Sequence, residues 1–214
     1  MRDAFHTDLD TLSDDLVEMS RSVAAAIRSA SESLLRSDED QARRVVAADT
    51  DINAFQYSID DRVVELMTQH QPMASDLRFI LGSMRVAIDL ERMGDMAKHV
   101  AKIGARTGCR MPGVRDVFAG MADVANRIAD KTTAILRTRD RLDAAQLDLD
   151  DDEMDALFAR LMALLGDGWR HGTETAVDVA MLGRSYERFA DHAVRIAQQI
   201  VYQVTGEVHL DRRP

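Results

Sequence analysis

The chain is poor in the residues that interrupt regular structure. Its 214 residues include only 3 Pro and 11 Gly, and the first Gly is Gly82. A β-sandwich or β-barrel needs such residues at its many turns, so these classes are excluded. Aromatic residues make up 5% of the chain, whereas Ala, Leu, Met, Arg, Asp and Glu dominate it. This composition favours an all-α fold.

Long apolar runs and basic charge are also scarce. No stretch approaches 18 uninterrupted apolar residues, and the opening MRDAFHTDLD lacks the apolar core of a signal peptide. The 37 Asp and Glu exceed the 27 Lys and Arg, which disfavours nucleic acid and anionic lipid as partners. Cys109 is the single cysteine and cannot form an internal disulfide. We therefore expect a cytoplasmic protein with no nucleic-acid partner and no direct membrane insertion.

Five polar or Gly- and Pro-containing breaks divide the chain into six expected helices. The cluster at 36–40 offers Ser37 or Asp38 as a helix N-cap, and Pro72 ends the next helix. The segment GARTGCRMPG at 104–113 is the strongest linker. Beyond it we expect helices over about 114–139, 144–166 and 173–204. Helices of roughly 25 to 35 residues predict an elongated bundle.

An internal repeat supports a division into two units. The segment ERMGDMAKHVAKI from Glu91 matches ERFADHAVRIAQQI from Glu187, and DTDINAF from Asp49 matches DDEMDAL from Asp151. The sequence thus predicts an all-α protein of two tandem three-helix bundles, at 1–107 and 114–214, joined by a linker at 108–113.

Acidic residues recur in pairs one helical turn apart in both units. The pairs are Asp49 with Asn53, Glu91 with Asp95, Asp151 with Asp155, and Glu187 with Asp191. In the first pair an amide stands in place of one acid. Like charges at this spacing repel. A bound cation would remove that cost, because two carboxylates one turn apart can ligate one ion or bridge two.

Chain spacing predicts that the pairs meet within each hairpin. The centres of the first two pairs are each 21 residues from Pro72, and those of the last two are each 18 residues from His171. On the third and sixth helices the acids lie roughly opposite the main apolar stripe, so we expect outward-facing surface metal sites. Oxygen ligands favour Mg, Mn or Fe over Cu. Zn remains a further candidate, and His99 could add a nitrogen ligand. Ordinary solvated acids are the competing interpretation.

Two further features have alternative interpretations. His99, with Lys102 three residues later, resembles the motif of a histidine phosphotransfer domain. The competing function class is therefore a phosphotransfer bundle that uses His99, or an enzyme that uses a metal held by the carboxylates. A second apolar stripe follows the acidic side of the third helix, where we expect a helix of the other unit to cover it; otherwise it is a partner surface. This stripe consists of Leu77, Leu81, Met84 and Ile88.

The segment 49–103, with its combination QP…DLRFI…ERMGD, resembles the signature of the PhoU family of phosphate-transport regulators, and ERFADHAVRIAQQI resembles its second copy. The resemblance implies two three-helix bundles with multinuclear iron or zinc clusters held by E(D)xxxD motifs. Asn53 stands where the family has an acid. The motif otherwise maps to Asp49, Glu91, Asp95, Asp151, Asp155, Glu187 and Asp191.

The resemblance also implies a non-enzymatic function. Such a regulator represses phosphate-starvation signalling by coupling a phosphate ABC transporter to its sensor histidine kinase. The implied partners are the ATPase subunit of the transporter and the kinase, which would bring the chain to the inner membrane indirectly. The sequence does not determine which metal is bound or what the oligomeric state is. A homodimer is one of the states that it allows.

Overall fold

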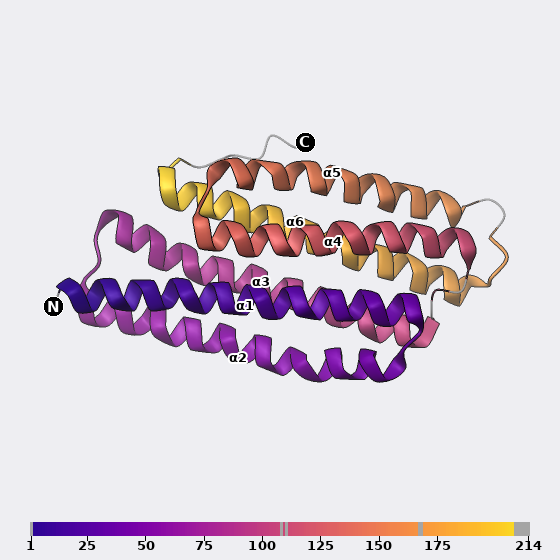
Figure 1. Cartoon of the computed structure of the whole chain (residues 1–214), viewed down its shortest axis with the longest axis horizontal. Coiled ribbons are helices and arrows are strands. Elements are labelled where there is room, and N and C mark those ends of the chain that lie inside the picture. The colour runs from indigo at the N-terminus through magenta and orange to yellow at the C-terminus, as the bar shows by residue number, and fades with distance from the viewer. Residues whose placement is uncertain (1, 108, 110, 167–168, 208–214) are drawn as a thin grey trace.

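The computed structural model describes residues 2–107, 109, 111–166 and 169–207. All regular structure in these ranges is helical, and the helices run along one long axis (Figure 1). They are α1 Arg2–Arg36, α2 Glu39–His70, α3 Ala74–Thr107, α4 Pro112–Thr138, α5 Arg141–Leu164 and α6 Thr173–Thr205. The prediction of an all-α, elongated bundle is confirmed, and the observed helix ends lie within a few residues of the expected ones.

Local chemistry explains the helix ends. Asp38 is the N-cap of α2, and its carboxylate accepts a hydrogen bond from the backbone N of Gln41 at 2.9 Å. Gln71, in the left-handed region at φ 45°, ends α2 directly before Pro72. Pro112 opens α4, where its missing N–H costs nothing. The linker predicted at 108–113 includes residues 108 and 110, which lie outside the described residues.

The two predicted units pack into one molecule. Helices α1, α2 and α3 contact one another, as do α4, α5 and α6, and the two sets meet through α1 with α4 and α3 with α6. The buried apolar side chains of both sets form one continuous core. Helices α2 and α5 lie on the outside, and α1, α3, α4 and α6 lie between them (Figure 1). Helices α3 and α6 therefore have neighbours on several sides.

Helices α3 and α6 are antiparallel, and their register sets the position of the acidic motifs. Arg106 near the end of α3 pairs with Asp178 near the start of α6, and Asp89 in the middle of α3 pairs with His192 of α6 at 2.8 Å. The acidic motifs at 91–95 and 187–191 adjoin this middle contact. Both motifs thus lie at one level, near the centre of the long axis.

The second apolar stripe of α3 is only partly covered. Leu77 and Met84 are half-buried, whereas Leu81 is 42% and Ile88 41% exposed. The expectation that a helix of the other unit covers the stripe is therefore wrong for Leu81 and Ile88. Helix α6 instead packs along the adjacent face of α3, which contains Gly82.

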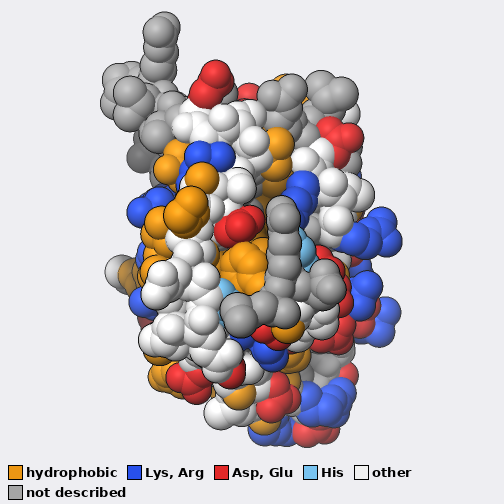
Figure 2. Space-filling model, turned by 90° about the vertical axis from the view of Figure 1, so that its left-hand side faces the viewer, with side chains coloured by type: hydrophobic (Ala, Val, Ile, Leu, Met, Phe, Trp, Pro, Cys, Tyr) orange, Lys and Arg blue, Asp and Glu red, His pale blue; other side chains and the backbone are white. Residues whose placement is uncertain are grey.

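In the part of the chain that the structure describes, no helix has an apolar stretch long enough to span a bilayer. Figure 2 shows the end of the molecule where α2 turns into α3, and acidic, basic and apolar side chains intermix there. Charge of one sign does not dominate that end.

Cys109 provides a chemical test of the packing between α3 and α4. The side chain is 2% exposed, and burial raises the pKa of its thiol to about 11. Both effects slow attack by a disulfide reagent, because the thiolate is the reactive form. At pH 8 we expect native protein to react about a hundred-fold more slowly than urea-unfolded protein. Equal rates in a stopped-flow assay would contradict this packing.

Candidate functional site

The structure brings the predicted acidic pairs together in two groups, one in each unit. The first cluster lies between α2 and α3 and the second between α5 and α6. The first cluster consists of Asp49, Asn53, Glu91 and Asp95. The second cluster consists of Asp151, Asp155, Glu187 and Asp191. Glu91 lies close enough to feel the charge of Asp49, and Glu187 that of Asp151 and Asp155, so the acids of each hairpin are neighbours, as the equal chain spacing predicted.

The expectation that these acids face outward is wrong for three of them. Asp49 is 7% exposed, Asp151 2% and Glu187 9%. The sequence argument placed the acids opposite one apolar stripe, but α3 and α6 are central helices with neighbours on more than one side. The acids lie at the interface between two packed helices of one unit, where a carboxylate loses much of its hydration.

A lysine offsets part of the negative charge of the first cluster. Lys98 of α3 donates through Nζ to Asp49 Oδ2 of α2 at 2.6 Å and to Asp95 Oδ1 at 3.0 Å. The hydrogen bond to Asp49, more than any other contact, raises the pKa of Lys98 and keeps it charged. Asn53 donates to the same Asp49 oxygen at 3.4 Å. An ammonium group therefore bridges α2 and α3 at the first cluster.

Glu91 completes the first cluster. Burial, and then the charge of Asp95, raise the pKa of Glu91 above its ordinary value. Arg92 opposes this rise, with its Nε 3.5 Å from Glu91 Oε2 and its Nη1 3.4 Å from Asp95 Oδ2. Arg92 is about half exposed, so solvent screens its contribution. Three carboxylates and an amide thus share two basic side chains from their own unit.

In the second cluster, the described residues give Glu187 a single basic partner. Glu187 pairs with Arg184 through Oε1, while its buried Oε2 has no hydrogen-bond partner among the described residues. Burial first, and then the charge of Asp191, raise the pKa of Glu187 to about 7. Asp155 and Asp151 act in the same direction. A carboxylate so disfavoured as an anion is stabilised by a proton or by a bound cation.

Alignment of the repeats explains the difference. Lys98 lies three residues after Asp95, and the residue three after Asp191 is Val194. The sequence analysis missed this contrast because it compared only the acids. The signal was present in the matched segments ERMGDMAK and ERFADHAV, which differ in charge at their last position.

The acidic run of α5 divides between two neighbouring helices. Asp150 is held by α4, with Arg127 Nε 3.1 Å and Lys131 Nζ 2.5 Å from its carboxylate oxygens. Asp151, one residue later, acts electrostatically on Glu187 of α6. Successive helical residues point about 100° apart, so the run serves both neighbours. Only Asp151 and Asp155 of this run join the second cluster.

The second cluster fits a metal ion better than the first. Its oxygen donors suit a hard or borderline divalent ion, and Glu187 Oε2 is a buried acceptor without a hydrogen bond. In the described ranges, no three Asp, Glu, His or Cys side chains converge closely enough to coordinate an ion as they stand. Binding therefore requires side-chain rotation, for which the exposed Asp155 and half-exposed Asp191 have room. His99 lies exposed on α3.

Two repeated three-helix units, each with a carboxylate cluster between its second and third helix, define a class of tandem-repeat all-α proteins. The PhoU domain model matches this chain at residues 16–104 and 118–200. The chain belongs to the PhoU family. Both matches contain their unit's cluster.

Individual relatives agree over nearly the full length. The chain is 37% identical over 210 residues to the phosphate-specific transport system accessory protein PhoU homolog 1 of Mycobacterium tuberculosis, covering 96% of this chain and 95% of the relative. It is also 37% identical over 210 residues to PhoU homolog 2 of the same organism, covering 96% and 99%. The crystal structure of PhoU from Pseudomonas aeruginosa superimposes with a TM-score of 0.86 at 24% identity, covering 95% of this chain and 100% of that one. That likeness bears on the fold alone.

Proposed function

We propose that this protein is a non-enzymatic accessory regulator of phosphate uptake. It couples a phosphate ABC transporter to the sensor histidine kinase of the phosphate-starvation response and acts at the cytoplasmic side of both. The observation that supports this most is the near-full-length similarity to proteins named phosphate-specific transport system accessory proteins. When phosphate is plentiful, the regulator contacts both components and keeps the kinase in its non-activating state.

Affinity capture tests this coupling. The tagged full-length chain is expressed at its native level in its own host, and membranes are solubilised from phosphate-rich cells. We expect the transporter ATPase and the sensor kinase to co-elute with it, at least ten times above a helical bait of equal net charge. Recovery of neither component, identified by mass spectrometry, would contradict the proposal.

A phosphotransfer function is the competing class and has a separate test. His99 is exposed on α3, so a kinase could reach it. Incubation with ³²P-labelled sensor kinase should leave the chain unlabelled if it acts as an adaptor. Label that appears on the chain and disappears in His99→Ala would replace the adaptor proposal with a phosphorelay. His171→Ala, at another exposed histidine, is the matched control.

We also propose that a divalent metal is bound at the second cluster in preference to the first. Asp151, Asp155, Glu187 and Asp191 would hold it, and a bound ion would supply positive charge that neutralises their carboxylates. Arg184 alone leaves Glu187 with a raised pKa, whereas Lys98 already bridges α2 and α3 in the first cluster. Iron and zinc are the metals that the family resemblance implies, and Mg and Mn suit the same oxygen donors.

A further inference from the structure

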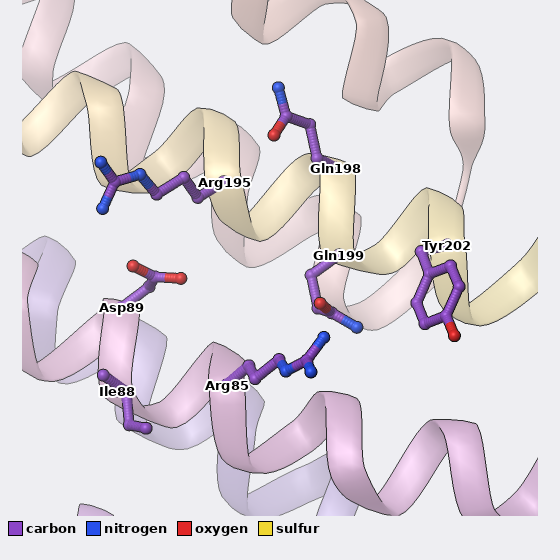
Figure 3. Close-up of a pocket in the computed structure, with 7 residues that line it drawn as sticks. All are labelled: Arg85, Ile88, Asp89, Arg195, Gln198, Gln199 and Tyr202. Atoms are coloured by element: carbon purple, nitrogen blue, oxygen red, sulfur yellow. The ribbon is translucent and has the colours of Figure 1, made fainter. Parts of the chain in front are cut away.

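A cavity lies in the groove between α3 and α6, beside the acidic clusters but lined by other residues. It has a volume of about 610 Å³ and is open to solvent. Figure 3 shows that Arg85, Ile88 and Asp89 line it from α3, and that Arg195, Gln199 and Tyr202 line it from α6. The volume falls within the range of roughly 300 to 1,000 Å³ typical of small-molecule sites. Because its walls belong to different units, a ligand there would contact both.

Two unpaired guanidinium groups give this cavity an unusual charge for an acidic chain. The chain has a formal net charge of −10, and many of its Arg side chains form ion pairs with carboxylates. Arg85 and Arg195 form none with the described residues, although both line the same cavity. Arginine binds phosphate and carboxylate oxygens with paired hydrogen bonds. The cavity therefore offers two free anion-binding groups on opposite walls.

Asp89 offsets only part of this positive charge, because one carboxylate faces two guanidinium groups. It lies in the middle of α3, and its Oδ1 is 2.8 Å from His192 Nδ1 of α6. That contact fixes the carboxylate to the opposite wall and leaves its second oxygen as an acceptor. Two positive side chains therefore face one negative side chain, which is itself engaged with a histidine. An anion that also carries hydroxyl groups would match this arrangement.

The remaining lining favours an organic group on the anion. Tyr202 offers an aromatic ring, and Ile88 is 41% exposed. Gln199 reaches from α6 toward Arg85 (Figure 3), and its Nε2 has no hydrogen-bond partner among the described residues. Gly82 permits this close approach, because a Cβ there would lie 2.7 Å from that nitrogen. That nitrogen is buried against α3, so the exposed Ile88 and the ring of Tyr202 are what the cavity offers to a flat organic ring.

We propose that this cavity binds a phosphate monoester attached to a flat, hydroxyl-bearing organic group, of which nucleoside monophosphates are the simplest representatives. Arg85 and Arg195 bind the phosphate oxygens. Tyr202 packs against the ring, and Asp89 accepts a hydrogen bond from a ligand hydroxyl. The proposal concerns a site distinct from the acidic clusters and does not depend on the proposed coupling function.

Isothermal titration calorimetry on the full chain tests the site at 0.1 M salt. The probes are AMP, GMP, CMP and UMP, with adenosine and inorganic phosphate as partial ligands. We expect at least one nucleotide to bind with 1:1 stoichiometry and both partial ligands to bind at least about ten-fold more weakly. Arg85→Gln and Arg195→Gln should each weaken nucleotide binding by about ten-fold or more. Tyr202→Leu should weaken it without changing the affinity for phosphate.

Controls separate a specific site from general charge attraction. Arg137→Gln removes an exposed arginine of α4 outside the cavity and should leave the affinity unchanged. Each variant is first checked by circular dichroism and thermal melting. The bound nucleotide should raise the Tm of the unsubstituted chain and of Arg137→Gln equally, and that of the two cavity variants less. The proposal is overturned if no nucleotide binds with a Kd below about 10 mM. It is equally overturned if inorganic phosphate binds as tightly as the nucleotides. It is also overturned if Arg137→Gln weakens binding as much as the two cavity variants.

Discussion

Metal-free protein with Glu187→Gln is expected to be more stable than the unsubstituted chain at pH 8, by up to about 3 kcal/mol. Burial, and then Asp191, raise the pKa of Glu187 from 4.5 to about 7. Between these values the unfolded chain releases its proton while the folded chain keeps it. The contribution of Glu187 to folding stability is therefore complete below about pH 4.5 and is lost as the pH rises through 7. Glutamine stays neutral and removes this loss.

Urea unfolding between pH 4.5 and 8, in the presence of a chelator, measures this effect. The difference in unfolding free energy between Glu187→Gln and the unsubstituted chain should appear above about pH 5, grow through pH 7 and level off near pH 8. Asp152→Asn changes an exposed acid on α5 and should give no such pH dependence. A stability difference that is the same at every pH would contradict the raised pKa. Excess divalent metal should reverse the order, because it stabilises only the chain that binds it.

Lys98 and Val194 occupy the position at which the two repeats differ in charge. Substitutions that reverse this difference should reverse the metal affinities of the two clusters. Val194→Lys places an ammonium three residues after Asp191, as Lys98 stands after Asp95. Because Val194 is a core residue and 9% exposed, the ammonium would bear a cost of burial, but its charge should abolish metal binding at the second cluster. Lys98→Met should cost the metal-free protein about 2 kcal/mol, because the buried Asp49 loses its ion pair.

Elemental analysis of untagged protein and chelator-treated melts measure this exchange. Divalent metal should restore the stability of Lys98→Met and should have no effect on Val194→Lys. Val194→Leu lengthens the side chain without adding charge, so it should keep the metal. If Val194→Lys retained as much metal as the unsubstituted chain, the lysine would not be what separates the two clusters. Unchanged stability of Lys98→Met would show that its contact with Asp49 is too solvated to matter.

The fold could be predicted from the sequence because its signals are local. Asp38 caps α2 by accepting a hydrogen bond from the backbone N of Gln41, three residues later in the chain, and Pro72 follows the end of α2. The match between the segments at Glu91 and Glu187 predicted the two three-helix units, which α1–α3 and α4–α6 form. Equal spacing from each turn then sufficed to place the acidic pairs side by side.

What the sequence left unpredicted depends on contacts between helices. The burial of Glu187 arises because α6 is surrounded, and a stripe on one helix does not report how many neighbours it has. Lys98 was missed because its partner Asp49 is 49 residues away along the chain. The cavity between Arg85 and Arg195 likewise exists only through the antiparallel register of α3 and α6. Sequence spacing therefore predicted which acids meet, but not which charge neutralises them.

Crystals of the full chain grown with Mn²⁺, measured at a wavelength where manganese scatters anomalously, test most directly whether the two clusters differ. We expect a manganese peak between α5 and α6, within bonding distance of Glu187 and at least one of its acidic neighbours, and no peak beside Lys98. A manganese peak between Asp49 and Glu91 with none at Glu187 would contradict the assignment of the metal to the second cluster.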